Sequence, residues 1–355
     1  MAGTARRAAI ATLVAVAIVA SALALWKLRL LLALIFLGFI VAAAMRPGVD
    51  WLRSRGVPRA AGVAVHYLAV VGLIALFLWL VVPRAVDQLT QAVGSVPTSA
   101  SALQKEANKS TGIKHEILVG IQKRLKRLPS ATTLVHPALT ITKTAFEVVL
   151  GIFFTFATAA YWIFERDRAI TLVTSLLPRP KRRVVRDTWI LIDLKLGAFV
   201  RGQLLLVGFV ATLLCLSFWL IGLPYWILIG IGAGVVELVP VIGPISAGVL
   251  AIGVGLTQSW QTALAAGLAV LGVRLVEDYV VVPRVLGHAV GLSPLVVLIS
   301  VTAIGLLLGG VFVLLAIPIA AVLATLVDVI LRDRDPSTEE VPTVLFPAQD
   351  AETGR

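Results

Sequence analysis

Residues 237–244 interrupt a long apolar tract and read Glu237-Leu238-Val239-Pro240-Val241-Ile242-Gly243-Pro244. Glu237 is the only charged residue between Arg201 and Arg274, and a carboxylate in such surroundings is costly. Each proline removes a backbone N–H and disfavours continuation of a helix, and the carbonyl groups freed in this way need partners inside the protein or in a wet cavity. The stretch therefore predicts a broken helix with a buried acid, the kind of element that forms transport sites. The alternative is a kinked helix in which Glu237 only faces a neighbouring segment.

The composition predicts an all-α integral membrane protein. Of the 355 residues, 59% are hydrophobic and 14% are charged, whereas soluble domains have roughly 45–50% apolar and 25% charged residues. Several apolar stretches reach the length of about 18 residues that indicates a transmembrane helix. We expect about eight membrane segments, two hairpins broken by glycine and proline, and an amphipathic helical insertion.

The charge pattern indicates membrane topology. The formal net charge is +12, but the basic residues flank apolar spans, so they favour contact with anionic lipid headgroups and not with nucleic acid. Basic loops at residues 45–59 and 179–186 are expected in the cytoplasm. We predict a multi-pass membrane protein with both termini cytoplasmic.

The sequence lacks the motifs of the common catalytic and cofactor sites. It contains no His-Glu-x-x-His, no Gly-x-Ser-x-Gly, no Cys/His metal spacing and no P-loop. We therefore predict no enzymatic activity, no cofactor and no metal. Any pumping would draw on an ion gradient and not on ATP.

Five regions follow from the pattern of apolar and polar segments. A helical hairpin of residues 8–25 and 30–44, with Lys27 and Arg29 at its tip, precedes a third span at about 60–82. The alternative for residues 8–25 is a secretory signal. Region 83–144 has apolar residues recurring on one helical face, which predicts amphipathic helices and not spans. The other regions are a fourth span with a basic loop (145–201), a transport core (202–330) and a disordered polar tail (331–355).

Two further features belong to the expected core. Arg274, Glu277 and Asp278 are spaced i, i+3 and i+4, so they share a helical face. They either pair among themselves or meet Glu237 across a polar cavity. The uncharged tract 294–327 contains Gly305, Gly309 and Gly310 near its middle and predicts the second broken hairpin.

Residues 199–321 resemble the autoinducer-2 exporter family of bacterial membrane proteins. The motifs occur in the family's order: Phe199-Val200-Arg201-Gly202-Gln203, Gly222-Leu223-Pro224-Tyr225, Glu237 to Pro244, Glu277-Asp278-Tyr279, Val282-Pro283-Arg284, Gly287, Gly291-Leu292-Ser293-Pro294 and Ala316-Ile317-Pro318. This chain departs from the family at two places. It has Ile304-Gly305 where the family often has Gly-Gly. Before the Glu277-Asp278 pair the family usually has Gln or Glu, whereas the polar residue here is Arg274.

The resemblance implies transport of small molecules and a homo-oligomer, a pentamer for the exporter members. Members are linked to export of the quorum-sensing signal autoinducer-2, and others to sodium–proton antiport. We therefore expect a secondary transporter that exports a small polar molecule like autoinducer-2, coupled to protons or sodium. A sodium–proton antiporter and a non-transporting scaffold or channel are the alternatives. The predicted substrate and ion pathway consists of Glu237, Pro240, Gly243, Pro244, Arg201, Gln203, Arg274, Glu277 and Asp278.

Overall fold

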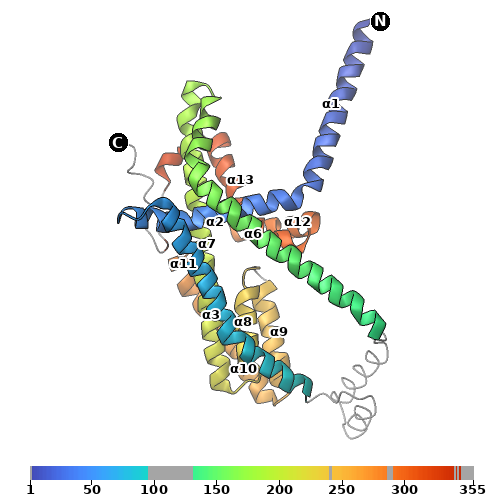
Figure 1. The fold of residues 1–355 in the computed structure, drawn as a ribbon, viewed down its shortest axis with the longest axis vertical. Coiled ribbons are helices and arrows are strands. Elements are labelled where there is room, and N and C mark those ends of the chain that lie inside the picture. Colours follow the sequence, from blue (N-terminus) through green and yellow to red (C-terminus); the bar gives the residue numbers. More distant parts are fainter. Residues whose placement is uncertain are drawn as a thin grey trace. The chain divides into compact units, whose positions relative to one another are not determined.

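The structure is a computed structural model that describes residues 2–94, 131–239, 242–285, 291–339, 341 and 344. Within these ranges the secondary structure is helical, with no strand, which confirms the predicted fold class (Figure 1). The chain forms two compact units. The first comprises Met1–Arg59, Gly151–Gly202 and Leu286–Arg355, and the second comprises Ala60–Leu150 and Gln203–Val285.

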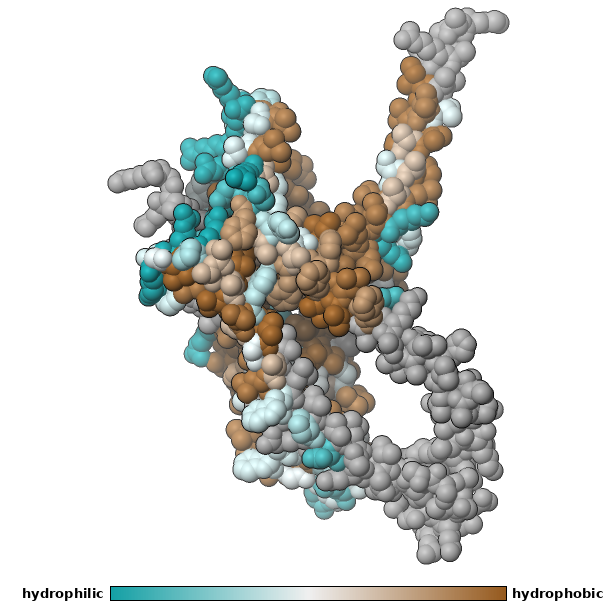
Figure 2. Space-filling model, in the orientation of Figure 1, coloured by the Kyte–Doolittle hydropathy of each residue, from teal (hydrophilic) through white to brown (hydrophobic). Residues whose placement is uncertain are grey.

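Five helical stretches within these ranges are long and apolar enough to cross a membrane: Ile10–Lys27, Arg29–Arg53, Phe146–Ser175, Arg179–Ile221 and Phe312–Leu331. Shorter apolar helices include Trp226–Val236, Gly243–Leu256 and Pro294–Leu308. Apolar side chains cover residues 10–26 of α1 (Ala2–Lys27) (Figure 2). The protein is therefore an integral membrane protein, and the total of eight membrane segments stays a prediction.

The predicted amino-terminal hairpin is wrong. Helix α1 is joined to α2 (Arg29–Arg53) by Leu28 alone, and the two helices meet at an angle (Figure 1). The backbone bonds Leu28 N–H to Ala24 O and Leu32 N–H to Leu28 O continue the helical pattern through the junction. Lys27-Leu28-Arg29 has none of the glycine, proline or asparagine chemistry that a tight reversal needs, so the chain bends there without folding back.

Helix ends differ from the expected loops in several places. Helix α2 continues to Arg53, so the basic connection is reduced to residues 54–58, where Gly56 has a φ of +87°. Helices α3 (Arg59–Gly94) and α6 (Ala131–Ser175) run through the expected limits of the amphipathic region. The residues between them, 95–130, lie outside the described part, so the amphipathic insertion stays a prediction.

Helix α7 (Arg179–Ile221) begins in the first unit, where it contributes to that unit's apolar core. Ile40 and Ala43 of α2 pack there on Leu196 of α7 and on Leu315. The carboxyl-terminal hairpin of this unit consists of α12 (Pro294–Leu308), the 3₁₀ turn η2 (Gly310–Leu315) and α13 (Ala316–Leu331). Gly309, with a φ of +106°, ends α12. The predicted break in tract 294–327 is confirmed at Gly309 and Gly310, whereas Gly305 lies inside α12.

Ion pairs, some buried and some with an exposed partner, connect the polar ends of the helices in the first unit. They are Arg46–Asp50 (3.4 Å), Arg59–Asp50 and Arg59–Asp167 (both 3.9 Å), Arg166–Asp167 (3.2 Å) and Arg166–Asp193. Arg166 and Asp193 are both buried, so each provides the opposite charge that the other needs.

The tail packs on the first unit where it is described, so the expected disorder is wrong for these residues. The 3₁₀ turn η3 (Pro336–Thr338) is capped by Asp335, and Pro336 is buried. Lys195 Nζ, buried in α7, lies 2.7 Å from Glu339 Oε1 and 3.3 Å from Thr325 Oγ1. A buried ammonium requires such partners, so the tail supplies a charge that α7 lacks.

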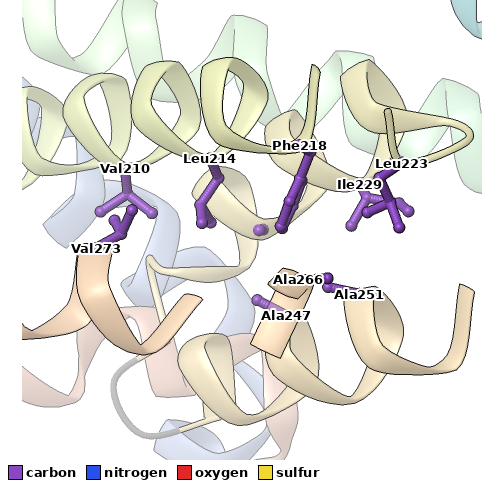
Figure 3. Close-up of a cluster of buried hydrophobic side chains, with 10 residues drawn as sticks. Val210, Leu214, Phe218, Leu223, Ile229, Ala247, Ala251, Ala266 and Val273 are labelled. Atoms are coloured by element: carbon purple, nitrogen blue, oxygen red, sulfur yellow. The ribbon is translucent and has the colours of Figure 1, made fainter. Parts of the chain in front are cut away.

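In the second unit, α8 (Trp226–Val236), α9 (Ile242–Leu256) and α10 (Trp260–Val276) pack on the second half of α7. Val210, Leu214 and Phe218 project from α7 towards small residues such as Ala247 and Ala266 (Figure 3). A methyl group at Gly234 would lie 2.6 Å from Ala211 Cβ, so α7 and α8 approach closely. Small residues allow this packing in membranes, where the hydrophobic effect does not drive helix association.

Glu339→Gln tests whether the tail stabilises the first unit through Lys195. The change leaves a buried ammonium without its carboxylate, and because Glu339 is half exposed we expect a loss of about 1 kcal/mol in the free energy of unfolding. Thermal unfolding in detergent measures it. Glu165→Gln is the matched control, because it removes the acid of an exposed pair with Arg168. Equal unfolding temperatures for the two variants would contradict the assignment.

Candidate functional site

The break at residues 237–241 separates two helices that pack on each other as a hairpin. Helix α8 has 11 residues and α9 has 15, so they are only about 16 Å and 22 Å long, short of a bilayer core of about 30 Å. This tract could form a single bent helix that spans the membrane or two half-helices. The structure shows two half-helices (Figure 1).

The start of α9 packs closely against the backbone at the end of α8. A methyl group on Gly243 would lie 2.7 Å from Glu237 Cα and 2.8 Å from Val236 O, so this position requires glycine. Pro244 lies in the first turn of α9, where the missing N–H costs nothing. Pro240 lies outside the described residues.

Gln203 provides a partner for the backbone of the break. Its Nε2 donates to the carbonyl oxygen of Glu237 at 3.3 Å. Gln203 lies on α7, so this side chain ties the end of α8 to the helix beside it. The contact is of the kind that freed carbonyls need inside a bilayer.

Arg274 is the centre of a charge cluster with three carboxylates. Its Nη1 lies 2.9 Å from Glu237 Oε1 and 3.2 Å from Glu277 Oε2, and its Nε lies 3.0 Å from Asp278 Oδ2. The side chains of Glu237 and Glu277 are 7% and 5% exposed, whereas those of Arg274 and Asp278 are 34% and 44% exposed. The predicted pairing along one helix is therefore present, and Arg274 also contacts Glu237 directly. A polar cavity between this helical face and Glu237 stays a prediction.

A π-helical turn carries the two acids that follow Arg274. It is η1 (Glu277–Val281), which continues α10 and leads into α11 (Val282–Val285). Sequence reasoning missed this turn, although Pro283 was a signal for it. A proline inside a helix removes one hydrogen bond and clashes with the carbonyl four residues earlier, here Tyr279, so the turn before it must adjust. Such π-bulges are frequent at functional sites.

Arg201 is engaged elsewhere. It belongs to the first unit, where it donates to the carbonyl oxygens of Val344 (2.9 Å), Ala43 (3.4 Å) and Ala44 (3.1 Å). The structure therefore assigns it to holding backbone, and the predicted place of Arg201 on the substrate pathway is not supported. The structure does bring together Glu237, Gly243, Gln203, Arg274, Glu277 and Asp278.

Comparisons with known proteins agree on one family. The family model described as "AI-2E family transporter" matches residues 13–332. The chain is 27% identical over 310 residues to "Putative transport protein YrrI" of Bacillus subtilis, covering 84% of this chain and 86% of that protein. It is 26% identical over 321 residues to "Putative transport protein MT0215" of Mycobacterium tuberculosis, covering 86% and 84%.

Gly243→Ala tests the close approach at the break. The added methyl group meets backbone atoms that cannot move away cheaply, so we expect a loss of about 1–3 kcal/mol in the free energy of unfolding, measured in detergent. Gly253→Ala is the matched control on the same helix, because a methyl group there meets no atom within 4 Å. Its stability should stay the same or rise. Equal effects of the two changes would show that the break is not tightly packed.

Proposed function

This chain belongs to the AI-2E transporter family, and from that premise we propose that it is a secondary transporter coupled to an ion gradient. The cargo is a small polar molecule resembling autoinducer-2, exported across the bacterial inner membrane. We also propose cytoplasmic termini and a homo-oligomer, a pentamer by family resemblance.

The observation that carries this proposal is the imbalance of charge around Arg274. One guanidinium faces three carboxylates, two of them buried. With all four groups ionised, the cluster holds two uncompensated negative charges, and burial makes such charges costly. A proton or sodium ion that joins the cluster removes part of this cost, so the site favours a cation. Protons are the expected coupling ion, and sodium is the alternative.

The location of Glu237 links cation binding to backbone movement. Glu237 follows the last residue of α8, at the break, and holds Arg274 of α10 through its carboxylate. A cation on Glu237 weakens this bond and leaves Arg274 to Glu277 and Asp278. Of these contacts, only the hydrogen bond from Gln203 then still holds the end of α8. The hairpin thus has two bonding states, as alternating access requires.

The accessible members of the cluster suit a polar cargo. Arg274 and Asp278 are partly exposed, and together they offer hydrogen-bond donors and acceptors to a polyhydroxylated molecule. We assign the buried acids to the ion and the exposed pair to the solute. Sodium–proton antiport is the second candidate function, because the excess of negative charge alone would serve it. A scaffold or channel is the third and would show no dependence on a gradient.

Glu237→Gln tests the transport site. Glutamine keeps the size and a hydrogen bond to Arg274 but removes the charge, so we expect gradient-driven export of autoinducer-2 from proteoliposomes to fall by about tenfold or more. The unfolding temperature should stay within a few degrees of the wild-type value. Glu165→Gln, at an exposed acid of α6, should leave the flux unchanged.

Proton and sodium gradients are imposed separately in this assay. Proton-driven export of the solute supports the main proposal, whereas sodium–proton exchange that needs no solute supports the second candidate. Unchanged flux in Glu237→Gln would contradict the role of this acid. Export independent of both gradients would contradict secondary transport itself.

A further inference from the structure

A groove lies between the start of α7 and the end of α13, within the first unit. Its volume is about 600 Å³, in the range of roughly 300–1,000 Å³ that is usual for small-molecule sites. The walls are mainly aliphatic and include Val185 and Ile192 from α7 and Leu326 and Val329 from α13. The groove takes no part in the proposed transport site.

The groove lies at the level where α13 changes from apolar to polar. The candidate span Phe312–Leu331 ends beside it, and Asp333, two residues later, lines its rim. A change of this kind marks the boundary between acyl chains and headgroups. Because the basic loop 179–186 indicates the cytoplasmic side, the groove faces the cytoplasmic leaflet.

The two segments that border the groove carry an excess of basic residues, and the charged residues that line the groove are Lys181 and Asp333. Residues 179–188 and 328–335 contain seven basic and four acidic side chains. Hydrophilic side chains gather where α6 ends and α7 begins (Figure 2). Lys181 lines the groove itself and is exposed. Asp328 is paired with Arg332 at 2.8 Å and with Arg334 at 3.5 Å, so its charge is already compensated.

The interior of the groove offers little to a polar ligand. Thr188 is buried, and its hydroxyl donates to the carbonyl oxygen of Val184 at 2.6 Å. The ring of Trp189 forms part of the wall and is stacked on Trp162, with ring centroids 6.0 Å apart. A tryptophan at such a boundary is typical of contact with lipid. The groove therefore combines an apolar interior with one exposed cation, Lys181, and borders segments that carry a basic excess.

We propose that this groove binds an anionic phospholipid of the cytoplasmic leaflet. One acyl chain lies between α7 and α13, and the phosphate lies beside Lys181. The apolar walls account for the chain, and Lys181, together with the basic excess of the bordering segments, selects a negatively charged headgroup over a zwitterionic one. The lipid thereby holds the end of α13 against α7.

Native mass spectrometry of the full-length protein tests the proposal. Purified, delipidated protein is mixed with equal amounts of phosphatidylglycerol and phosphatidylcholine of identical chains. We expect one phosphatidylglycerol to be retained preferentially. Lys181→Gln should weaken this retention about fivefold, and Val329→Trp should abolish it by filling the groove. Arg168→Gln is the matched control, because it removes an exposed cation of the same unit that does not line the groove.

Lys181 is exposed, so its variant keeps the test valid if Val329→Trp fails to fold, and unfolding temperatures monitor both. Equal retention of the two lipids would overturn the proposal, as would wild-type retention in a folded Val329→Trp. Displacement of the lipid by an equimolar soluble alkyl phosphate would also overturn it, by showing a general site for anionic amphiphiles. A change in oligomeric mass without a change in lipid retention would assign the groove to contact between copies.

Discussion

The guanidinium of Arg274 lies within hydrogen-bond distance of three carboxylates, and through Glu237 it ties the broken hairpin to α10. Glu237 comes from the break between α8 and α9, while Glu277 and Asp278 come from the π-turn that continues α10. Without Arg274, two buried acids would face each other with no opposite charge, which costs several kcal/mol. A transporter can use this dependence, because any cation that shares the acids with Arg274 changes what holds the hairpin.

Buried cations organise the first unit in a similar way. Lys195 and Arg201 both lie on α7, and both find partners in the carboxyl-terminal tail, at Glu339 and at Val344 O. The tail is therefore part of the folded unit in its described residues. These contacts satisfy charges and carbonyl groups that water cannot reach, which is the main constraint on irregular backbone in a membrane protein.

Local signals were sufficient to predict the helical class and the two broken hairpins. Prolines and glycines in apolar tracts act on the backbone next to them, so the breaks at 237–241 and at Gly309 could be read from the sequence. The i, i+3, i+4 spacing of Arg274, Glu277 and Asp278 likewise predicted their pairing. The partner of Arg201 could not be predicted, because Val344 is 143 residues away and its backbone carbonyl has no sequence signature. The bend at Leu28 was missed because two apolar runs in sequence look the same whether the chain folds back or continues.

The central claim is that the carboxyl group of Glu237 changes state when cargo and coupling ion bind. Infrared difference spectroscopy of the reconstituted protein, with and without solute and at low and high concentration of the coupling ion, measures this directly. We expect a carboxyl or carboxylate band that changes on binding, disappears in Glu237→Gln and persists in Glu165→Gln. A difference spectrum that is identical in wild-type protein and Glu237→Gln would contradict it.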